Sequence, residues 1–164
     1  MPIVGIEQPE FIKVDDDLRL RKYDGIFDFA FIWYQDIDTV YLVDGIKEAY
    51  SENKIKNMYE YLNNHGELYF IEILKENKYI PIGDVTFWQD DMPIVIGDKN
   101  YRGRKIGEKV VYALIQRGIQ LGYTTLKVHE IYDYNIGSRK CFEKNGFISY
   151  EKTENGNRFV LKLT

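Results

Sequence analysis

The stretch that decides the fold spans residues 92–107 and reads MPIVIGDKNYRGRKIG. Its first six residues form a short apolar run typical of a buried strand, and apolar residues recur at helical spacing from its last residue onward. Residues 100–107, where the loop meets the helix, contain two glycines and three basic residues. Backbone N–H groups of such a loop and of the helix start that follows it bind phosphate oxygens without a metal. We therefore predict a ligand that carries a phosphate or pyrophosphate.

Downstream of this loop, the pattern predicts one helix, a strand, a short helix and a terminal hairpin, over residues 107–121, 124–131, 135–145 and 147–163. A right-handed crossover would make the strands at residues 92–97 and 124–131 parallel neighbours. The phosphate loop would then lie at the carboxyl end of the first strand, where open α/β sheets bind ligands.

Upstream, the pattern predicts a first strand broken by Asp15-Asp16-Asp17, two helices and two further strands, over residues 11–23, 24–34, 51–64, 67–75 and 79–88. Residues 39–43 are β-branched and predict a loop or a short strand. Ser51 is the expected N-cap of the second helix. Tight polar turns join the strands before residue 97 and favour an antiparallel meander. With no repeat or linker, residues 1–164 are expected to form a single domain.

Composition limits the classes of function. The chain has 164 residues, is 45% hydrophobic and carries a formal net charge of −4, which suits one packed core and argues against nucleic acid as a partner. Cys141 is the single cysteine, so no intrachain disulfide or cysteine-based zinc site is expected, and no metal is assigned. No basic leader or long apolar run is seen. We expect a cytoplasmic protein without a membrane partner.

Two common phosphate-binding motifs are absent. A dinucleotide-binding fold would place Gly-x-Gly-x-x-Gly in a long series of alternating strands and helices, and this chain has neither. In a P-loop, four residues separate two glycines and a lysine follows, but Gly103 and Gly107 are one residue too close, and Glu108 stands at the lysine position.

A second segment, residues 135–147, reads NIGSRKCFEKNGF. Together with residues 101–107 it resembles the GNAT N-acetyltransferase superfamily, whose phosphate loop follows Arg/Gln-x-x-Gly-x-Gly/Ala and whose later segment follows Asn-x-x-Ser/Ala, then Tyr, then Gly-Phe. The matching residues are Arg102, Gly107, Asn135, Ser138, Gly146 and Phe147. Lys105 replaces the middle glycine, and we expect it to adopt a helical conformation at the start of the helix. The order of elements is also similar from about residue 11 onward.

The resemblance implies an α/β (α+β) domain with a mixed, mostly antiparallel twisted sheet, about four helices and a central parallel strand pair that splays to hold CoA. Acetyl-CoA would be the co-substrate. Its pantetheine arm would lie along Val95, Ile96 and Asp98, with Asn135 beyond. Its pyrophosphate would be bound mainly by backbone N–H groups of the loop Arg102, Gly103, Arg104, Lys105, Ile106 and Gly107.

The resemblance also implies transfer of the acetyl group to a primary amine of a small molecule or peptide, directly within a ternary complex. Glu72 and Asp84 interrupt apolar strands, where a buried carboxylate with a raised pKa can act as general base, and we favour Asp84. Each could equally lie on a solvated face or pair with Lys or Arg. The usual general acid is a tyrosine, but Phe142 stands at its position, so the candidate proton donors are Tyr134, Tyr132 and solvent.

The acceptor is open. A set of acidic residues could border a cleft for a polyamine, an aminoglycoside or a protein amino terminus, although solvated turns are the favoured interpretation: Asp36, Asp38, Asp44, Asp90 and Asp91. A homodimer is also left open. Phe142 and Lys105 favour an alternative, a non-catalytic acyl-CoA-binding sensor or scaffold. A nucleotide-binding regulator is a third hypothesis.

Overall fold

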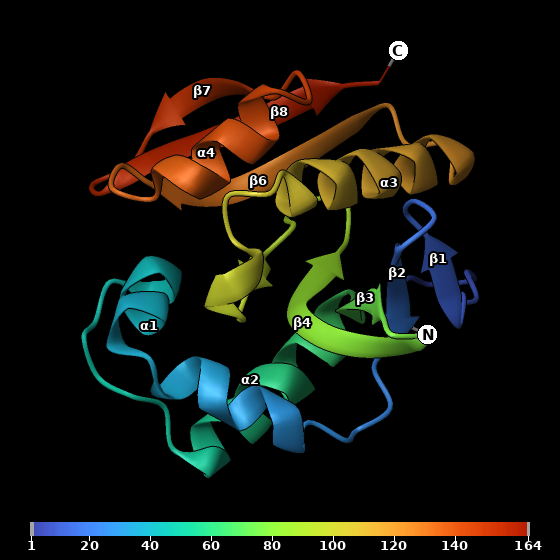
Figure 1. Ribbon diagram of the computed structural model, residues 1–164. Helices are drawn as coiled ribbons and strands as arrows, with labels where there is room; N and C mark the ends of the chain where they lie inside the picture. The colour runs from blue at the N-terminus through green and yellow to red at the C-terminus, as the bar shows by residue number, and fades with distance from the viewer. Residues whose placement is uncertain (1, 164) are drawn as a thin grey trace.

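The computed structural model describes residues 2–163 and contains two twisted antiparallel sheets (Figure 1). The first sheet has the order β1-β2-β3-β4-β5, formed by Phe11–Lys13, Leu18–Lys22, Glu67–Lys75, Lys78–Phe87 and Ile94–Ile96. The second has the order β6-β8-β7, formed by Thr125–Tyr132, Gly156–Lys162 and Ile148–Lys152. The meander and the terminal hairpin predicted from the sequence are both present.

The described residues form four α-helices and two 3-10 helices: α1 Ile37–Asp44, α2 Glu52–His65, α3 Ile106–Gln120, α4 Ile136–Glu143, η1 Asp28–Gln35 and η2 Lys99–Tyr101. Helix α3 lies on one side of the first sheet, and α1 and α2 lie on the other (Figure 1). No helix within residues 2–163 is long and apolar enough to cross a membrane.

Two hydrophobic clusters follow from the alternation of side chains along β3. Tyr69 and Ile71 face the larger cluster, which α3, α4 and both sheets enclose. Leu68 and Phe70 face the opposite side and pack with aromatic residues of η1 and α2. Because successive side chains of a strand point to opposite faces, both faces of β3 are buried.

Two sequence-based assignments are corrected by the structure. Residues 39–43 lie in helix α1, because Asp36 accepts a hydrogen bond from the Thr39 N–H (3.1 Å) as N-cap and Gly45 ends the helix with a left-handed φ of 78°. The helix expected at residues 24–34 starts only at Asp28 and is a 3-10 helix, because the Asp24 carboxylate accepts from the Ile26 N–H and holds that segment in a turn.

Candidate active site

Residues 89 and 91, which lead into β5, contact residues 125, 127 and 129 in the same order along β6, so the two strands run parallel. A cleft of about 650 Å³ lies between them. The Lys127 N–H donates to the Gln89 carbonyl (2.9 Å) just before β5 begins, and within residues 2–163 no ladder pairs the two strands beyond this point. A β-bulge between Val128 and Ile131 bends β6 where the strands part. The fold class expected from the sequence, with a splayed parallel pair, is therefore confirmed.

The backbone of β5 presents polar groups to this cleft. Asp84 is the register partner of Val95, and the Pro93 carbonyl accepts from the Thr86 N–H (3.0 Å), so residues 93 and 95 direct their backbone groups toward β4. Since neighbouring strand residues use opposite edges, Ile94 and Ile96 direct theirs toward β6. The sequence did not indicate Ile94, because this assignment depends on the register with β4.

The N-terminus of α3 also faces the cleft. Side chains of Asp36, Ser51 and Asn135 cap the other three α-helices. No side chain of residues 2–163 caps α3, so its first N–H groups are left to face the cleft. Lys105 does not adopt the expected helical conformation, which is a correction. Its φ is 63°, in the left-handed region where a glycine would be unstrained. Such a conformation places successive N–H groups around an anion.

Eight of the ten residues predicted to bind the cofactor line the cleft: Val95, Ile96, Arg102, Gly103, Lys105, Ile106, Gly107 and Asn135. Asp98 and Arg104 are not among the lining residues. The Asp98 carboxylate accepts from the Asn100 N–H (3.0 Å), and the Arg104 guanidinium lies 5.2 Å from the ring centroid of Tyr101.

Helix α1 bridges the two sides of the cleft. On the side of β5, Arg102 donates to the Ile96 carbonyl (2.9 Å) and to Thr39 Oγ1 (2.8 Å). On the side of β6, the Tyr134 hydroxyl donates to the Tyr41 carbonyl (2.9 Å). Thr39, Leu42 and Val43 of α1 line the cleft. This wall was not predicted from the sequence, although Asp36 and Gly45 were available as helix signals.

Asp84 is buried on the side of the first sheet that faces η1 and α2. The hydroxyls of Tyr34 (2.6 Å) and Tyr59 (2.9 Å) both donate to its Oδ2, and the side chain is not among those lining the cleft. Burial raises the pKa of Asp84 to about 6, although the two hydrogen bonds lower it. This carboxyl can therefore exchange a proton near neutral pH.

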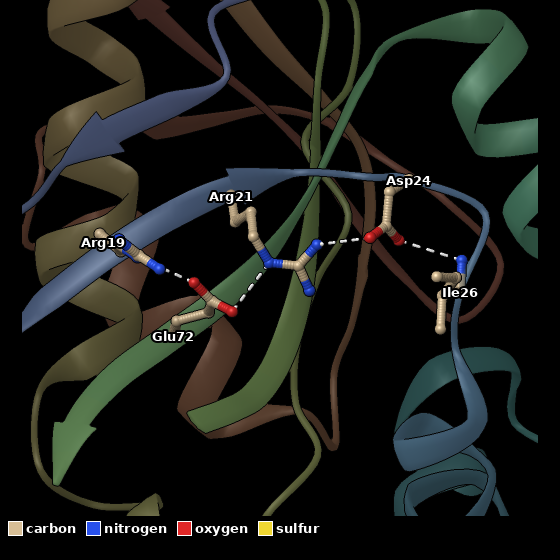
Figure 2. Close-up of polar contacts among 5 residues, drawn as sticks. All are labelled: Arg19, Arg21, Asp24, Ile26 and Glu72. Carbon is tan, nitrogen blue, oxygen red and sulfur yellow. Dashed lines mark hydrogen bonds and ion pairs between the residues drawn. The ribbon is translucent and has the colours of Figure 1, made fainter. Parts of the chain in front are cut away.

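Glu72, the other candidate base, is paired with two arginines (Figure 2). Its carboxylate oxygens accept from Arg19 Nε and Arg21 Nε, each at 2.8 Å, and Arg21 also contacts Asp24 at 3.1 Å. Figure 2 shows this network between β2 and β3. The sequence had left open that either carboxylate pairs with Lys or Arg, and Glu72 does so. It does not line the cleft.

The aromatic candidates for a proton donor differ in their surroundings. Phe142 lines the inner wall, is buried and packs edge-on against Phe147. Tyr134 already donates its hydroxyl to α1, and burial raises its pKa to about 12. Tyr132 lines the cleft from the end of β6, and burial together with Glu130 and Asp44 raises its pKa, so it stays protonated at neutral pH.

The acidic residues considered for an acceptor site do not gather. Asp36 pairs with Lys99 (2.9 Å), and Asp44 accepts from the Ile46 N–H and from the Tyr50 hydroxyl. Asp91 lies at the other end of the cleft and accepts from the His129 N–H. Within residues 2–163, no group of three or more His, Cys, Asp or Glu side chains could hold a metal ion.

Comparison with known proteins agrees with this geometry. The sequence model of the acetyltransferase (GNAT) family matches residues 33–147, and the chain belongs to this family. No curated protein matches the sequence.

Several solved structures share the fold. A domain from Methanocaldococcus jannaschii has a TM-score of 0.78 at 20% identity, over 91% of this chain and 100% of its own. A GNAT-family acetyltransferase from Bacillus anthracis has a TM-score of 0.75 at 16% identity, over 93% and 98%. RimL, a ribosomal L7/L12 α-N-protein acetyltransferase solved with coenzyme A, has a TM-score of 0.71 at 15% identity, over 93% and 98%.

Proposed function

We propose that this protein is an N-acetyltransferase that moves an acetyl group from acetyl-CoA to a primary amine, directly within a ternary complex. The observation that carries the proposal is the cleft between β5 and β6, which ends on the uncapped N-terminus of α3. A pyrophosphate fits the uncapped N–H groups, and an extended amide-bearing arm fits the backbone groups of Ile94 and the N–H of Ile96, whose carbonyl accepts from Arg102. RimL, with coenzyme A in its structure, has the same fold.

The residues that would bind acetyl-CoA are those that line the cleft. Backbone N–H groups of Gly103 to Gly107 would hold the pyrophosphate, and the Lys105 ammonium would add a positive charge. The arm would lie along Ile94 to Ile96, and Asn135 would contact it from α4. The Arg102 guanidinium is engaged with Thr39 and the Ile96 carbonyl, so its role would be to fix the loop against α1.

In the transfer, the neutral amine nitrogen forms a bond to the thioester carbon, the carbon–sulfur bond breaks, and the amine loses one proton while the thiolate gains one. Asp84 is the proposed final acceptor of the amine proton. Asp84 and the two tyrosines that donate to it, Tyr34 and Tyr59, are all buried and do not line the cleft, so the proton would reach Asp84 through an intervening water. Tyr132 is the proposed donor to the thiolate, because it lines the cleft while the hydroxyl of Tyr134 is already engaged.

The acceptor would be an amine on a small molecule or peptide. Among proteins of the same fold, RimL is named for a ribosomal protein substrate, and AAC(6')-Ib was solved with the aminoglycoside paromomycin and acetyl-CoA. AAC(6')-Ib has a TM-score of 0.73 at 16% identity. Their acceptors span proteins and small molecules, which is why the proposal names an amine and no particular compound. A cytoplasmic location remains part of the proposal.

The alternative function, an acyl-CoA-binding sensor or scaffold, is favoured by Phe142, which cannot donate a proton. Two measurements separate the hypotheses. Calorimetry with acetyl-CoA tests binding, and thiol release from acetyl-CoA across a panel of primary amines tests turnover. Binding with amine-dependent thiol release supports the enzyme, and binding without release supports the sensor. The absence of binding at saturating acetyl-CoA would contradict both hypotheses.

A further inference from the structure

Asp91 lies in the segment that leads into β5, beside β6. In a regular parallel pair, N–H groups at alternate residues of one strand donate to carbonyls at alternate residues of the other. The hydrogen bond from the Lys127 N–H to the Gln89 carbonyl follows this rule. Two residues further along each strand, the same rule would have the His129 N–H donate to the Asp91 carbonyl.

The side chain of Asp91 takes the place of that carbonyl. The His129 N–H donates to Asp91 Oδ1 (3.1 Å), and the Met92 N–H donates to the same oxygen (2.9 Å). The main-chain carbonyl of Asp91 instead accepts from the Trp88 N–H (3.3 Å), in the turn that leads back to β4. The segment that leads into β5 is therefore joined to β6 here through a side chain in place of a main-chain carbonyl.

The neighbouring contacts place this side-chain link between a paired part and an open part of the two strands. Before it, Gln89 holds the strands together, through its carbonyl and through its side-chain Nε2, which donates to the Thr125 carbonyl (3.3 Å). On β6, the bulge between Val128 and Ile131 includes His129 itself and bends the strand, and beyond Asp91 the residue Ile94 lines the open cleft. An extended arm lying between two strands needs about twice the usual strand spacing of roughly 4.8 Å.

We propose that Asp91 is a positioning residue that sets the separation of β5 and β6, and with it the width of the cleft that takes the pantetheine arm. This inference rests on the proposed function, since the arm belongs to acetyl-CoA. Asp91 acts through the backbone of His129 and Met92 and needs no contact with the substrate. An amide oxygen can accept the same two hydrogen bonds, so Asp91→Asn keeps this side-chain link between the strands, which we call the wedge. Asp91→Ala removes the wedge.

The experiment compares wild type, Asp91→Ala, Asp91→Asn and the control Asp90→Ala, whose side chain precedes the wedge. Acetyl-CoA affinity is measured by calorimetry, and KM is measured for acetyl-CoA and for one amine found in the panel. Because small misplacements in a binding cleft weaken binding strongly, Asp91→Ala should raise the Kd and KM of acetyl-CoA about tenfold or more. Asp91→Asn should stay within about threefold of wild type, since its amide oxygen preserves the acceptor.

The KM for the amine distinguishes a wedge from general loss of structure. A variant that only unfolds more readily has less active enzyme, so its kcat falls while both KM values stay unchanged. Unchanged acetyl-CoA affinity in Asp91→Ala would overturn the inference, provided that wild type binds acetyl-CoA. Failure of wild type to bind would instead refute the proposed function. If Asp91→Ala does not fold, amide hydrogen exchange in wild type decides: slow exchange at His129 supports the wedge, and fast exchange overturns it.

Discussion

The backbone of Gly107 lies against the thiol of Cys141, so a Cβ at residue 107 would lie 2.7 Å from Sγ. Helices α3 and α4 meet at this contact, which leaves no room for a side chain at residue 107. Gly107 therefore serves packing as well as the proposed close approach of a phosphate, and Cys141 fills the space that glycine leaves. Burial raises the pKa of the Cys141 thiol, which suits a packing role.

Gly107→Ala should lower the free energy of unfolding by about 1–3 kcal/mol, because overpacking forces the two helices apart. Adding Cys141→Ala should recover most of this loss, since the nearest remaining atom of residue 141 would be Cβ at 3.9 Å. Urea unfolding of both single variants and the double variant gives the coupling energy. A double variant that is no more stable than Gly107→Ala alone would show that the contact is not the cause.

Lys105→Gly should stabilise the free protein by about 0.5–1 kcal/mol, because glycine adopts a left-handed conformation without the strain that lysine carries. Arg104→Gly is the matched control. Its φ is not positive, so the greater freedom of glycine in the unfolded chain should destabilise it. Thermal unfolding of the two variants checks the prediction, and equal changes in Tm would contradict it.

In the presence of acetyl-CoA, the difference in stability between Lys105→Gly and Arg104→Gly should become smaller or change sign. Lys105→Gly removes an ammonium beside the proposed pyrophosphate, which is worth about 1 kcal/mol or more as a charge-assisted contact. Calorimetry should therefore show weaker acetyl-CoA binding by Lys105→Gly than by Arg104→Gly. The strained conformation of Lys105 would then lower the stability of the free protein while its ammonium increases the affinity for acetyl-CoA.

Much of the fold follows from local sequence signals. Ser51 caps α2 as predicted, and the observed bounds of β3, Glu67–Lys75, equal those expected from the apolar pattern. These elements are specified by side-chain periodicity and caps within a few residues. Helix α1 was missed because Thr39, Val40 and Tyr41 favour strands by intrinsic propensity, while its capping residues and buried contacts determine the helix.

The site was only partly predictable, because its geometry depends on distant pairs. The loop and Asn135 were found from motifs, whereas Ile94 requires the register with β4. The arginine partners of Glu72 lie more than 50 residues away in sequence, so no local pattern could show that this carboxylate is paired. The left-handed φ of Lys105 was likewise hidden, since lysine rarely adopts it.

Tyr132→Phe should lower kcat about 100-fold or more if its hydroxyl protonates the departing thiolate, with little change in acetyl-CoA affinity. Tyr134→Phe is the control, because its hydroxyl donates to the Tyr41 carbonyl on α1. That variant should lose about 1 kcal/mol of stability and retain most of its kcat. Steady-state kinetics tests this prediction. A larger loss of kcat in Tyr134→Phe than in Tyr132→Phe would make Tyr134 the proton donor.

Glu72→Gln should lower stability while the folded enzyme keeps its kcat. The substitution removes the charge that holds Arg19 and Arg21 together on β2 (Figure 2), and loss of a partner in a buried ion pair costs about 3–5 kcal/mol at most. Kinetics normalised to the folded fraction tests this. A large fall in normalised kcat would restore Glu72 as a candidate base.

Asp84→Asn should change the pH dependence of both the folding stability and the activity. Burial raises the pKa of Asp84 to about 6 from an ordinary value of 3.8, so the folded protein takes up this proton more readily than the unfolded chain does. Between about pH 4 and 6, ionisation therefore costs folding free energy, and the full penalty is present above pH 6. A shift of this size corresponds to about 3 kcal/mol.

The amide introduced by Asp84→Asn cannot ionise, so the stability of this variant relative to wild type should rise from pH 4 to pH 8 by about 2–3 kcal/mol. Urea unfolding at both pH values measures this difference, in which the other carboxylates cancel. The hydroxyls of Tyr34 and Tyr59 can still donate to the amide oxygen, so the fold should persist. Wild-type kcat/KM should increase as pH rises through about 6, and Asp84→Asn should lose both this rise and most of its activity. A variant that is more stable at pH 8 yet equally active would show that Asp84 is a buried structural acid and that the base lies elsewhere in the cleft.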